Sequence, residues 1–335
     1  MFAEYQGRFY SNIFFPYLDK HNIKTIIHLG DYFDRRRDVN FYSLHKNYEH
    51  FVKPLIDRNI TMDLIVGNHD IYFKNTNDIN SLTELLSDKF DNVHIYAEAQ
   101  EVDFGGFPIL LMPWINPQNE VYAMGMMDET RADTMLGHLE IDGFQMYKGY
   151  ESQGGLSKKE FQRFDTVMSG HFHHKSDDGQ IYYLGCPYEI TWSDYNDPKG
   201  FQVFDTDTRE LHRIVNPYKM FSKIYYDDSI ENFENHDVKQ YRNQYVKLIV
   251  VNKKDLYAFD KFTDRLLLAD CHEVKIIEDF SDLDANTVSD DIVENTEDTM
   301  TLLGKYIDDL SVNLDKDRLK NMMRSLYTEA QDLEL

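Results

Sequence analysis

The sequence has few cysteines, few basic residues and no long apolar segment. Cys186 and Cys271 are the only cysteines among 335 residues, which excludes a disulfide framework and a four-thiolate zinc site. No stretch approaches the ~20 consecutive apolar residues that a membrane helix needs. The first residues also lack the basic and apolar regions of a signal peptide. These absences predict a cytoplasmic protein that is not bound to a membrane.

The charge is strongly one-sided. Lys and Arg number 35 against 59 Asp and Glu, so the formal net charge is −24. A protein that coats nucleic acid needs a cationic surface, and the composition argues against that class while leaving room for local basic patches. Hydrophobic residues make up 42% and aromatic residues 14% of the chain, enough for a large core. The length predicts two domains and a tail.

Short apolar strands alternate with helical stretches from residue 24 to about residue 205. Strands are predicted at 25–29, 62–66, 93–96, 134–136, 166–168, 181–184, 201–204 and 211–215, and helices at 41–58 and 81–90. A hairpin is predicted over 100–112, because Gly105-Gly106 separates two apolar runs. This order predicts an α/β fold, with layers around a stacked pair of sheets.

The rest of the chain predicts a smaller unit and a tail. Strands at 245–251 and 273–277 flank a helix at 255–268, which indicates a small α+β module. Residues 278–298 contain nine acidic and no basic residues, typical of a solvated linker, and two amphipathic helices follow. The predicted organisation is a first domain over 1–216, a second over 217–280, an acidic linker over 281–298 and a helical tail over 299–335.

Four short motifs place a metal-type ligand just after a glycine that ends a strand. They are Gly30-Asp31-Tyr-Phe-Asp34, Gly67-Asn68-His69-Asp70, Gly137-His138-Leu-Glu140 and Gly170-His171-Phe-His173. Glycine permits a sharp turn, and loops at the carboxyl ends of strands can converge. Carboxylate, amide and imidazole donors without thiolate suit Mn²⁺, Fe²⁺ or Zn²⁺ in a two-metal hydrolytic site. Each motif alone would suit an ordinary turn, whereas their conjunction indicates a binuclear site.

With these motifs the sequence resembles the calcineurin-like metallophosphoesterases. It is most similar to the nuclease subunits of SbcCD-type DNA repair complexes and the recombination endonuclease subunits of tailed phages. Further motifs that carry the resemblance are Met112-Pro-Trp114, Gly137-His-Leu-Glu-Ile-Asp-Gly-Phe144, Tyr183-Leu-Gly-Cys-Pro187 and Asn196-Asp-Pro-Lys-Gly-Phe201. The resemblance implies a four-layer α/β/β/α sandwich, a small α+β capping domain and C-terminal helices that dock onto an SbcC-like ATPase.

The resemblance also implies roles for single residues. Asp31 matches the carboxylate that bridges two Mn²⁺ ions, and His173 matches a ligand of the second ion. Asn68, His138 and His171 match the other ligands of the first ion. His69 matches a histidine that contacts the scissile phosphate without binding metal. Independently of the resemblance, His69 beside Asp70 is typical of an acid with a carboxylate that orients it, so both are predicted to be catalytic. Asp34 is expected to support the ligands rather than to be one.

One departure from the family concerns its first strand, which ends in Asp-x-His and supplies two ligands to the second metal. No strand that ends in such a motif is predicted before residue 25, and Asp270-Cys271-His272 lies in the small module, where it is read as coincidence. We therefore expect a missing first strand, an open sheet edge, and one complete metal site with half of another. A start codon assigned too far downstream or a split gene is favoured over a naturally shortened enzyme.

A basic triplet, Arg35-Arg36-Arg37, follows the first motif directly. At the rim of a metal cleft in so acidic a protein it could hold DNA phosphates, or it could be a solvated loop tip.

The predicted function is a Mn²⁺-dependent DNA phosphodiesterase. It would be the exonuclease or endonuclease subunit of a phage recombination and repair complex, with DNA and an SbcC-like ATPase as partners; a homodimer stays open. Two alternatives remain at this point: a catalytically impaired structural subunit of that complex, and a phosphatase or small-molecule phosphodiesterase on the same fold.

Overall fold

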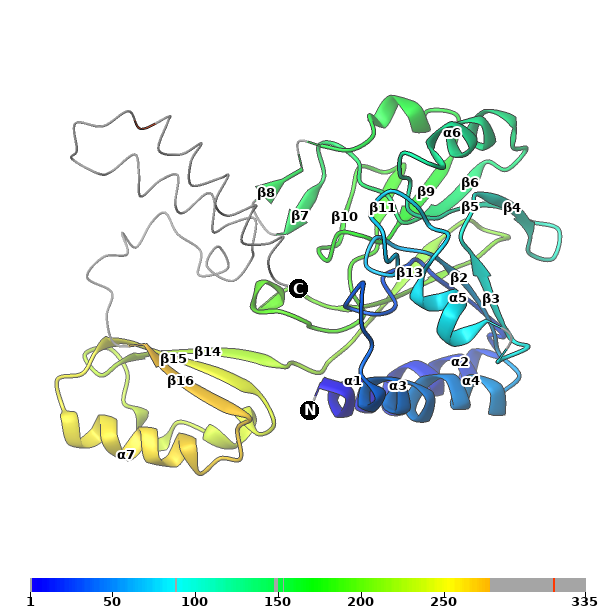
Figure 1. Ribbon diagram of the computed structural model, residues 1–335. Helices are drawn as coiled ribbons and strands as arrows, with labels where there is room; N and C mark the ends of the chain where they lie inside the picture. The colour runs from blue at the N-terminus through cyan, green and yellow to red at the C-terminus, as the bar shows by residue number, and fades with distance from the viewer. Residues whose placement is uncertain (1, 88, 148–149, 153, 278–315, 317–335) are drawn as a thin grey trace. The chain divides into compact units, whose positions relative to one another are not determined.

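Figure 1 shows the computed structural model, which describes residues 2–87, 89–147, 150–152, 154–277 and 316. The chain forms two compact units. The first consists of residues up to 190 together with 196–220, and the second of residues 191–195 and those from 221 onward. The predicted acidic linker and the helical tail, apart from residue 316, lie outside the described residues.

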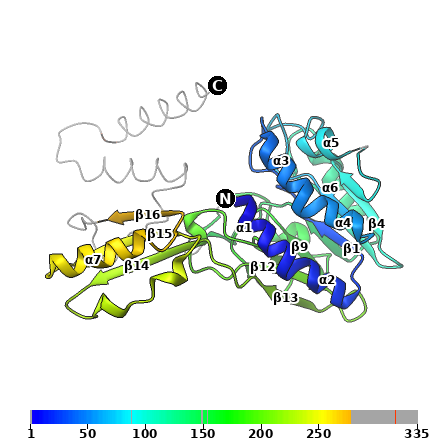
Figure 2. The same cartoon turned by 90° about the horizontal axis from the view of Figure 1, so that it is seen from below.

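One long helical segment precedes the first strand, and another follows it. The first consists of α1 (Phe2–Phe9), a π-helical turn (Tyr10–Phe14) and α2 (Phe15–His21). The second consists of α3 (Phe41–Asn47), a π-helical turn (Tyr48–Val52) and α4 (Lys53–Asp57), as predicted for 41–58. Figure 2 shows α1 and α2 as one continuous blue rod. None of the described helices is long and apolar enough to cross a membrane.

The first sheet has three parallel strands in the order β1-β2-β3. Its strands are β1 (Thr25–His28), β2 (Thr61–Ile65) and β3 (Val93–Tyr96), close to the predicted ranges. Helix α5 (Ser81–Leu86) is shorter than the predicted 81–90, because Ser87 already has an extended backbone. Among the described strands, β2 is the only neighbour of β1, so the other edge of β1 carries no described strand.

The second sheet is mixed, with six strands in the order β10-β11-β9-β6-β5-β4. Its strands are β4 (Gln100–Asp103), β5 (Pro108–Met112), β6 (Thr134–Gly137), β9 (Thr166–Ser169), β10 (Ser176–Asp177) and β11 (Ile181–Tyr183). The predicted β4–β5 hairpin is confirmed, and Gly105 and Gly106 both have the positive φ that its two-residue turn needs. Helix α6 (Glu120–Glu129), which the sequence pattern did not predict, connects β5 to β6.

Two separate hairpins complete the strands of the first unit. They are β7 (Gln145–Tyr147) with β8 (Tyr150–Glu151), and β12 (Gly200–Phe204) with β13 (Leu211–Val215). The β12 and β13 ranges agree with the prediction, whereas β7, β8 and β10 were not predicted. These three strands have only two or three residues each, too few for a period-two pattern to stand out.

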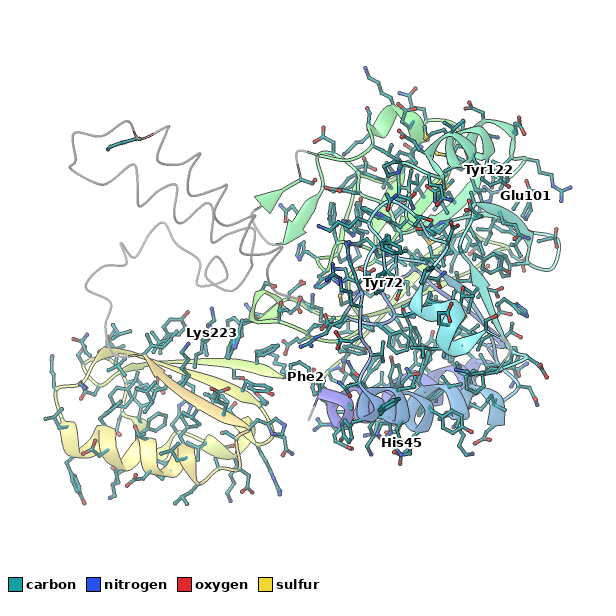
Figure 3. All side chains as sticks on the ribbon, in the orientation of Figure 1. Phe2, His45, Tyr72, Glu101, Tyr122 and Lys223 are labelled. Atoms are coloured by element: carbon teal, nitrogen blue, oxygen red, sulfur yellow. The ribbon has the colours of Figure 1, made fainter. Side chains whose placement is uncertain are left out.

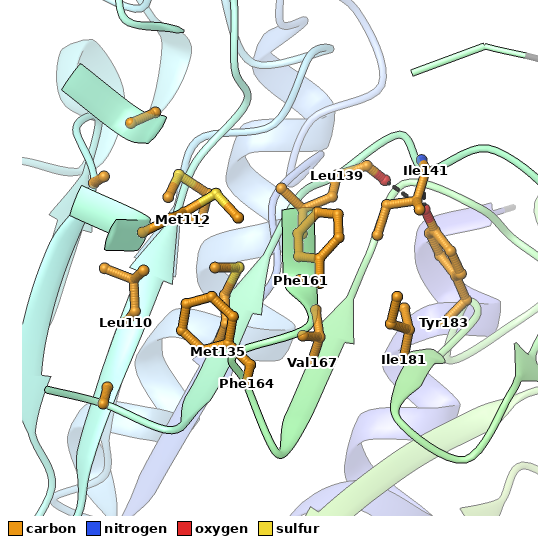
Figure 4. Close-up of a cluster of buried hydrophobic side chains, with 14 of the residues drawn as sticks. Leu110, Met112, Met135, Leu139, Ile141, Phe161, Phe164, Val167, Ile181 and Tyr183 are labelled. Carbon is orange, nitrogen blue, oxygen red and sulfur yellow. Dashed lines mark hydrogen bonds between the residues drawn. The ribbon is translucent and has the colours of Figure 1, made fainter. Parts of the chain in front are cut away.

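Three apolar layers hold the first unit together, and they identify it as an α/β/β/α sandwich. Successive residues of one strand point to opposite faces. Thus Leu110 packs with α6, while Ile109 and Leu111 pack between the two sheets. A third layer, including Met62 and Leu64, packs the first sheet against the helices. Figure 4 shows part of the α6-side cluster.

Over residues 221–277, the second unit contains a parallel three-stranded sheet and the helix α7. Its elements are β14 (Phe221–Asp227), β15 (Tyr245–Asn252), α7 (Leu256–Leu267) and β16 (Glu273–Ile277). All but β14 were predicted. Residues 191–195 group with this unit rather than with 1–190. The ring centroids of Trp192 and Phe221 are 4.7 Å apart, and Lys247 Nζ lies 4.3 Å from the centroid of the Trp192 ring. The predicted boundary at 216 lies four residues before the observed division at 220/221.

Candidate metal centre

Four loops bring polar side chains together at the carboxyl ends of strands from both sheets. Asp31 follows β1 and Asn68 follows β2 in the first sheet. His138 follows β6 and His171 follows β9 in the second. Neighbouring parallel strands end at the same edge of a sheet, and this is where ligand sites of α/β folds form. The sequence motifs predict that all four residues lie together.

His138 lies at the centre of this cluster and is buried. Its Nδ1 is 2.6 Å from the carbonyl oxygen of Leu29, which makes Nδ1 the protonated nitrogen of the neutral ring. In this neutral form, the form that can bind a metal, Nε2 presents a lone pair to Asp31 Oδ2 at 3.2 Å and to Asn68 Oδ1 at 2.9 Å. Three electron-rich atoms therefore face one another.

His171 adds a fourth donor atom. Its Nδ1 lies 3.0 Å from Asn68 Oδ1 and 3.3 Å from His138 Nε2. Ligand atoms of Asp31, His138 and His171 all lie within 4.8 Å of one another, and this is the only such group among the described residues. Facing lone pairs repel unless a cation lies between them. Imidazole, carboxylate and amide donors fit a divalent transition-metal ion.

The charges of these groups depend on one another. Burial opposes ionisation of Asp31, but His138 and His69 outweigh it and hold the pKa of Asp31 well below its usual range. Burial also opposes the charged form of His138, yet the Asp31 carboxylate outweighs burial and raises the pKa of His138. Burial and His138 lower the pKa of His171 to about 3. His171 is therefore neutral at pH 7 and free to bind a metal through its lone pair.

The backbone of these loops is strained and tightly packed. Asp31 (φ 51°) and His171 (φ 68°) both adopt the left-handed conformation that costs non-glycine residues energy and is concentrated at functional sites. A Cβ on Gly67 would lie 2.3 Å from the Asp31 backbone nitrogen and 2.3 Å from its Oδ1. Glycine is therefore required at 67 by the closeness of the two ligand loops rather than by a turn alone.

The predicted orientation of His69 by Asp70 is wrong. The ring of the exposed His69 has its Nδ1 2.7 Å from the carbonyl oxygen of Asp34. Asp70 is fully buried while its neighbour His69 is exposed, so the two side chains are in different environments. Asp34 acts through its main chain, consistent with a supporting role rather than that of a ligand.

Asp70 instead ties the two loops of the first sheet together. Its buried carboxylate accepts N–H groups from Tyr32 (3.0 Å), Phe33 (3.2 Å) and Gly67 (2.9 Å). Burial and the charge of Asp31 raise the pKa of Asp70 to about 7, although the N–H donors oppose this shift. Asp70 thus positions the backbone that follows Asp31 and the backbone that precedes Asn68. It is a positioning residue.

His173 is not part of the four-residue cluster. Its backbone carbonyl accepts a hydrogen bond from Lys199 Nζ at 2.8 Å. Its charge, when present, acts on His171 and contributes to lowering the pKa of that ring. The role of His173 as a ligand of a second ion stays a prediction.

The three adjacent arginines differ from one another. Arg35 is exposed and lies 3.6 Å from Asp38. Arg37 is also exposed. Arg36 is half-buried, and its Nη1 atom is buried with no hydrogen-bond partner among the described residues. Burial lowers the pKa of Arg36, while the charge of Asp31 opposes that shift. Arg36 therefore interacts electrostatically with Asp31 of the cluster.

One supporting group was not predicted. Lys199 is buried, and its Nζ donates to Asp197 (2.8 Å) as well as to the carbonyl of His173 (2.8 Å). Asp197 in turn lies 3.1 Å from His174 Nδ1. This network fixes the loop that carries His171. The only sequence signal for Lys199 was its place in the motif Asn196-Asp-Pro-Lys-Gly. Lysine is seldom buried, so nothing in that motif predicted a buried lysine.

The strands and loops that build this cluster lie within residues 8–175, which match the model of the calcineurin-like phosphoesterase family. The chain belongs to this family. It is 34% identical over 322 residues to exonuclease subunit 1 of Enterobacteria phage T4, covering 94% of this chain and 90% of that protein.

Two more distant relatives of this family member are bacterial, and both are named as subunits of the nuclease SbcCD. The one from Staphylococcus epidermidis is 25% identical over 190 residues, covering 47% of this chain and 48% of that protein. Its counterpart from Staphylococcus saprophyticus is 22% identical over 229 residues, covering 63% and 54%. The names of these relatives agree with the resemblance to phage and SbcCD nuclease subunits that the sequence motifs indicated.

Proposed function

We propose that this chain is a metal-dependent DNA phosphodiesterase, the nuclease subunit of an SbcCD-type exonuclease complex. The observation that carries the proposal is the convergence of Asp31, Asn68, His138 and His171 on one point. A phosphoesterase family match and relatives named as exonuclease and nuclease subunits support the substrate class.

The residues of the site divide the chemistry between them. A bound divalent ion would supply activation of water and neutralise charge on the phosphate. Asp31, Asn68, His138 and His171 would hold that ion. His69 projects from the same loop as Asn68, and its exposed ring is held by the Asp34 carbonyl. With Nδ1 donating to the Asp34 carbonyl, Nε2 faces outward, and once Nε2 has itself taken up a proton it can donate that proton to the leaving oxygen.

The metal we propose is Mn²⁺. Imidazole nitrogen, amide oxygen and carboxylate oxygen together suit a borderline ion better than Ca²⁺, which prefers oxygen ligands alone. The described residues contain one complete donor cluster. We expect one tightly bound Mn²⁺ per purified chain by isothermal titration calorimetry or elemental analysis. Two tightly bound ions would show that residues outside the four complete a second site.

A DNA-binding role for Arg35, Arg36 and Arg37 belongs to the same proposal. Their position after the Asp31 loop supports it, and Arg36 supports it most because its buried Nη1 lacks a partner among the described residues. The second partner we propose is an SbcC-like ATPase. The support for it is that three relatives are named as subunits of complexes.

The decisive experiment compares two substrates on the full chain. With Mn²⁺, linear duplex DNA should be degraded, and His69→Ala should abolish cleavage while calorimetry still shows Mn²⁺ binding. Preferential hydrolysis of bis-p-nitrophenyl phosphate over DNA would favour a small-molecule phosphodiesterase. Metal binding without either activity, also after addition of the partner ATPase, would favour a structural subunit. Loss of Mn²⁺ binding in His69→Ala would show that the role of His69 is misassigned.

A further inference from the structure

Two aromatic side chains are exposed on the loop that directly follows the turn at residues 67–70, which carries His69. Tyr72 is 43% and Phe73 is 49% exposed, whereas their neighbour Ile71 is fully buried. Their rings contact each other edge to face, with centroids 4.8 Å apart. Figure 3 labels Tyr72 beside the loop that leads into α5. Neither ring belongs to a regular helix or strand whose packing would account for it.

The loop that carries this aromatic pair is held firmly in place. The N–H of Tyr72 bonds to the carbonyl of Ile79 at 2.9 Å, and Ser81 N–H bonds to the carbonyl of Asp70 at 2.8 Å. Buried Asn77 donates to the carbonyls of Ala97 (2.9 Å) and Trp114 (3.0 Å). The loop therefore presents the rings on a fixed frame, so little ordering entropy would be lost when a ligand binds them.

The aromatic pair lies close to the metal centre. An extended chain spans at most ~3.6 Å per residue, so the Cα atoms of His69 and Tyr72 are at most ~11 Å apart. That distance corresponds to about three stacked nucleotides at ~3.4 Å per step. The backbone N–H of His69 bonds to Asp31 Oδ1 at 2.7 Å, so the loop starts at a ligand of the proposed ion.

A cation accompanies the rings. Lys74 is exposed and forms no ion pair with another described residue, in a chain whose net charge is −24. Aromatic rings beside a free cation are the combination with which proteins bind single-stranded nucleic acid, because every base has a face that can stack and every nucleotide has a phosphate. A protein partner would instead require a larger continuous apolar surface than two rings provide.

We propose that Tyr72 and Phe73 stack on an unpaired base of the DNA end whose phosphate lies at the metal centre. This inference rests on the proposed function and narrows it. Bases inside a duplex are covered by their neighbours on both faces, so a stacking platform selects a strand that is already unpaired. The substrate class is thus DNA with a frayed or single-stranded terminus, in preference to a blunt end.

The test measures binding and stacking together. Full-length protein with Mn²⁺ is titrated with a duplex that carries 2-aminopurine in a three-nucleotide overhang, of either polarity, with phosphorothioate linkages to prevent cleavage. A blunt duplex serves as reference. We expect quenching of 2-aminopurine, and an affinity for one overhang about tenfold above that for the blunt duplex, the magnitude of one base–aromatic stack. The double variant Tyr72→Ala/Phe73→Ala should lose both effects.

Matched variants control this experiment. Tyr122, 53% exposed on α6, is well separated from Tyr72 in Figure 3, and Tyr122→Ala should behave as the wild type. The single variant Tyr72→Trp should retain the quenching that the double variant loses, since tryptophan also stacks. Unchanged blunt-duplex affinity in the double variant shows that it is folded.

Each other result has one meaning. Quenching by the double variant that equals that of the wild type would overturn the stacking platform while leaving the nuclease function in place. Equal wild-type affinity for overhang and blunt duplex, without quenching, would do the same. A wild type that binds neither DNA would refute the DNA substrate and this inference with it.

Discussion

At the scale of single residues, the site depends on side chains that differ sharply although they are adjacent in sequence. His69 is exposed and Asp70 is fully buried, and they act on different partners. The same contrast separates the three arginines after Asp34. A buried guanidinium N–H without a partner is costly, because desolvation is not compensated by a hydrogen bond. A phosphate oxygen at Arg36 would remove that cost.

Arg36→Gln should therefore raise the KM for DNA by about tenfold or more, as expected for loss of a charge-assisted hydrogen bond of ~1.5–3 kcal/mol. Arg37→Gln is the matched control: its exposed charge should change KM by less than about threefold. Steady-state cleavage of linear DNA with Mn²⁺ measures both. Equal effects at the two positions would mean that the triplet acts only as a diffuse positive charge.

At the scale of elements, the centre is a meeting of strand ends. The loops after β1 and β2 approach so closely that Gly67 has no room for a side chain. Asp70 joins the same two loops by accepting their N–H groups. The loop after β9 is tied to the Asn196–Gly200 turn by Lys199. The four side chains proposed to bind the ion are thus held by rigid elements, which would favour tight and selective binding.

Two glycine substitutions test this description of the elements. Gly67→Ala places a Cβ 2.3 Å from the Asp31 main chain, so the loops must separate, and we expect loss of tight Mn²⁺ binding and of DNA cleavage. Gly125→Ala lies within α6 with open space around its Cβ. Alanine there should stabilise the fold by about 0.5–1 kcal/mol and leave Mn²⁺ binding unchanged.

Thermal unfolding and calorimetry with Mn²⁺ measure the effects of both glycine variants. A Gly67→Ala protein that still binds Mn²⁺ with wild-type affinity would contradict the close approach of the two loops. Destabilisation by Gly125→Ala would contradict the open environment on α6.

At the scale of the whole molecule, the net charge of −24 limits how DNA can bind. A chain of this charge repels phosphate on average, so we expect DNA contacts at local basic groups such as Arg36, Arg37 and Lys74. Each neutralised phosphate contributes about −0.9 to the slope of log K against log salt for duplex DNA.

We therefore expect a shallow salt dependence for duplex binding by the isolated chain, with a slope near −3 to −4 for three or four phosphate contacts. Fluorescence anisotropy of a labelled duplex between ~50 and 200 mM salt measures it. A slope steeper than about −7 would indicate a broad cationic surface and contradict this expectation. Addition of the partner ATPase should steepen the slope if that protein supplies further cations.

The amino-acid sequence alone was enough to predict the local features. Strand ends, the β4–β5 hairpin, the helix at 41–58 and the metal-type ligands follow from period, glycine position and side-chain chemistry, which are properties of neighbouring residues. Strand β14 and helix α6 escaped the pattern, the latter because Val121 and Tyr122 are exposed and weaken its amphipathic signal.

How those features act on one another depends on packing between distant segments. The sequence placed Asp70 beside His69, but burial turned the carboxylate inward to the backbone of another loop. It offered three equal arginines, of which packing buries part of one. The burial of Lys199 and the exposure of Tyr72 and Phe73 could not be predicted from the sequence, because a residue's partners and exposure depend on segments far away in the chain. Distances of about 3 Å between Asp31, Asn68, His138 and His171 arise from two sheets stacked together, which no local pattern encodes.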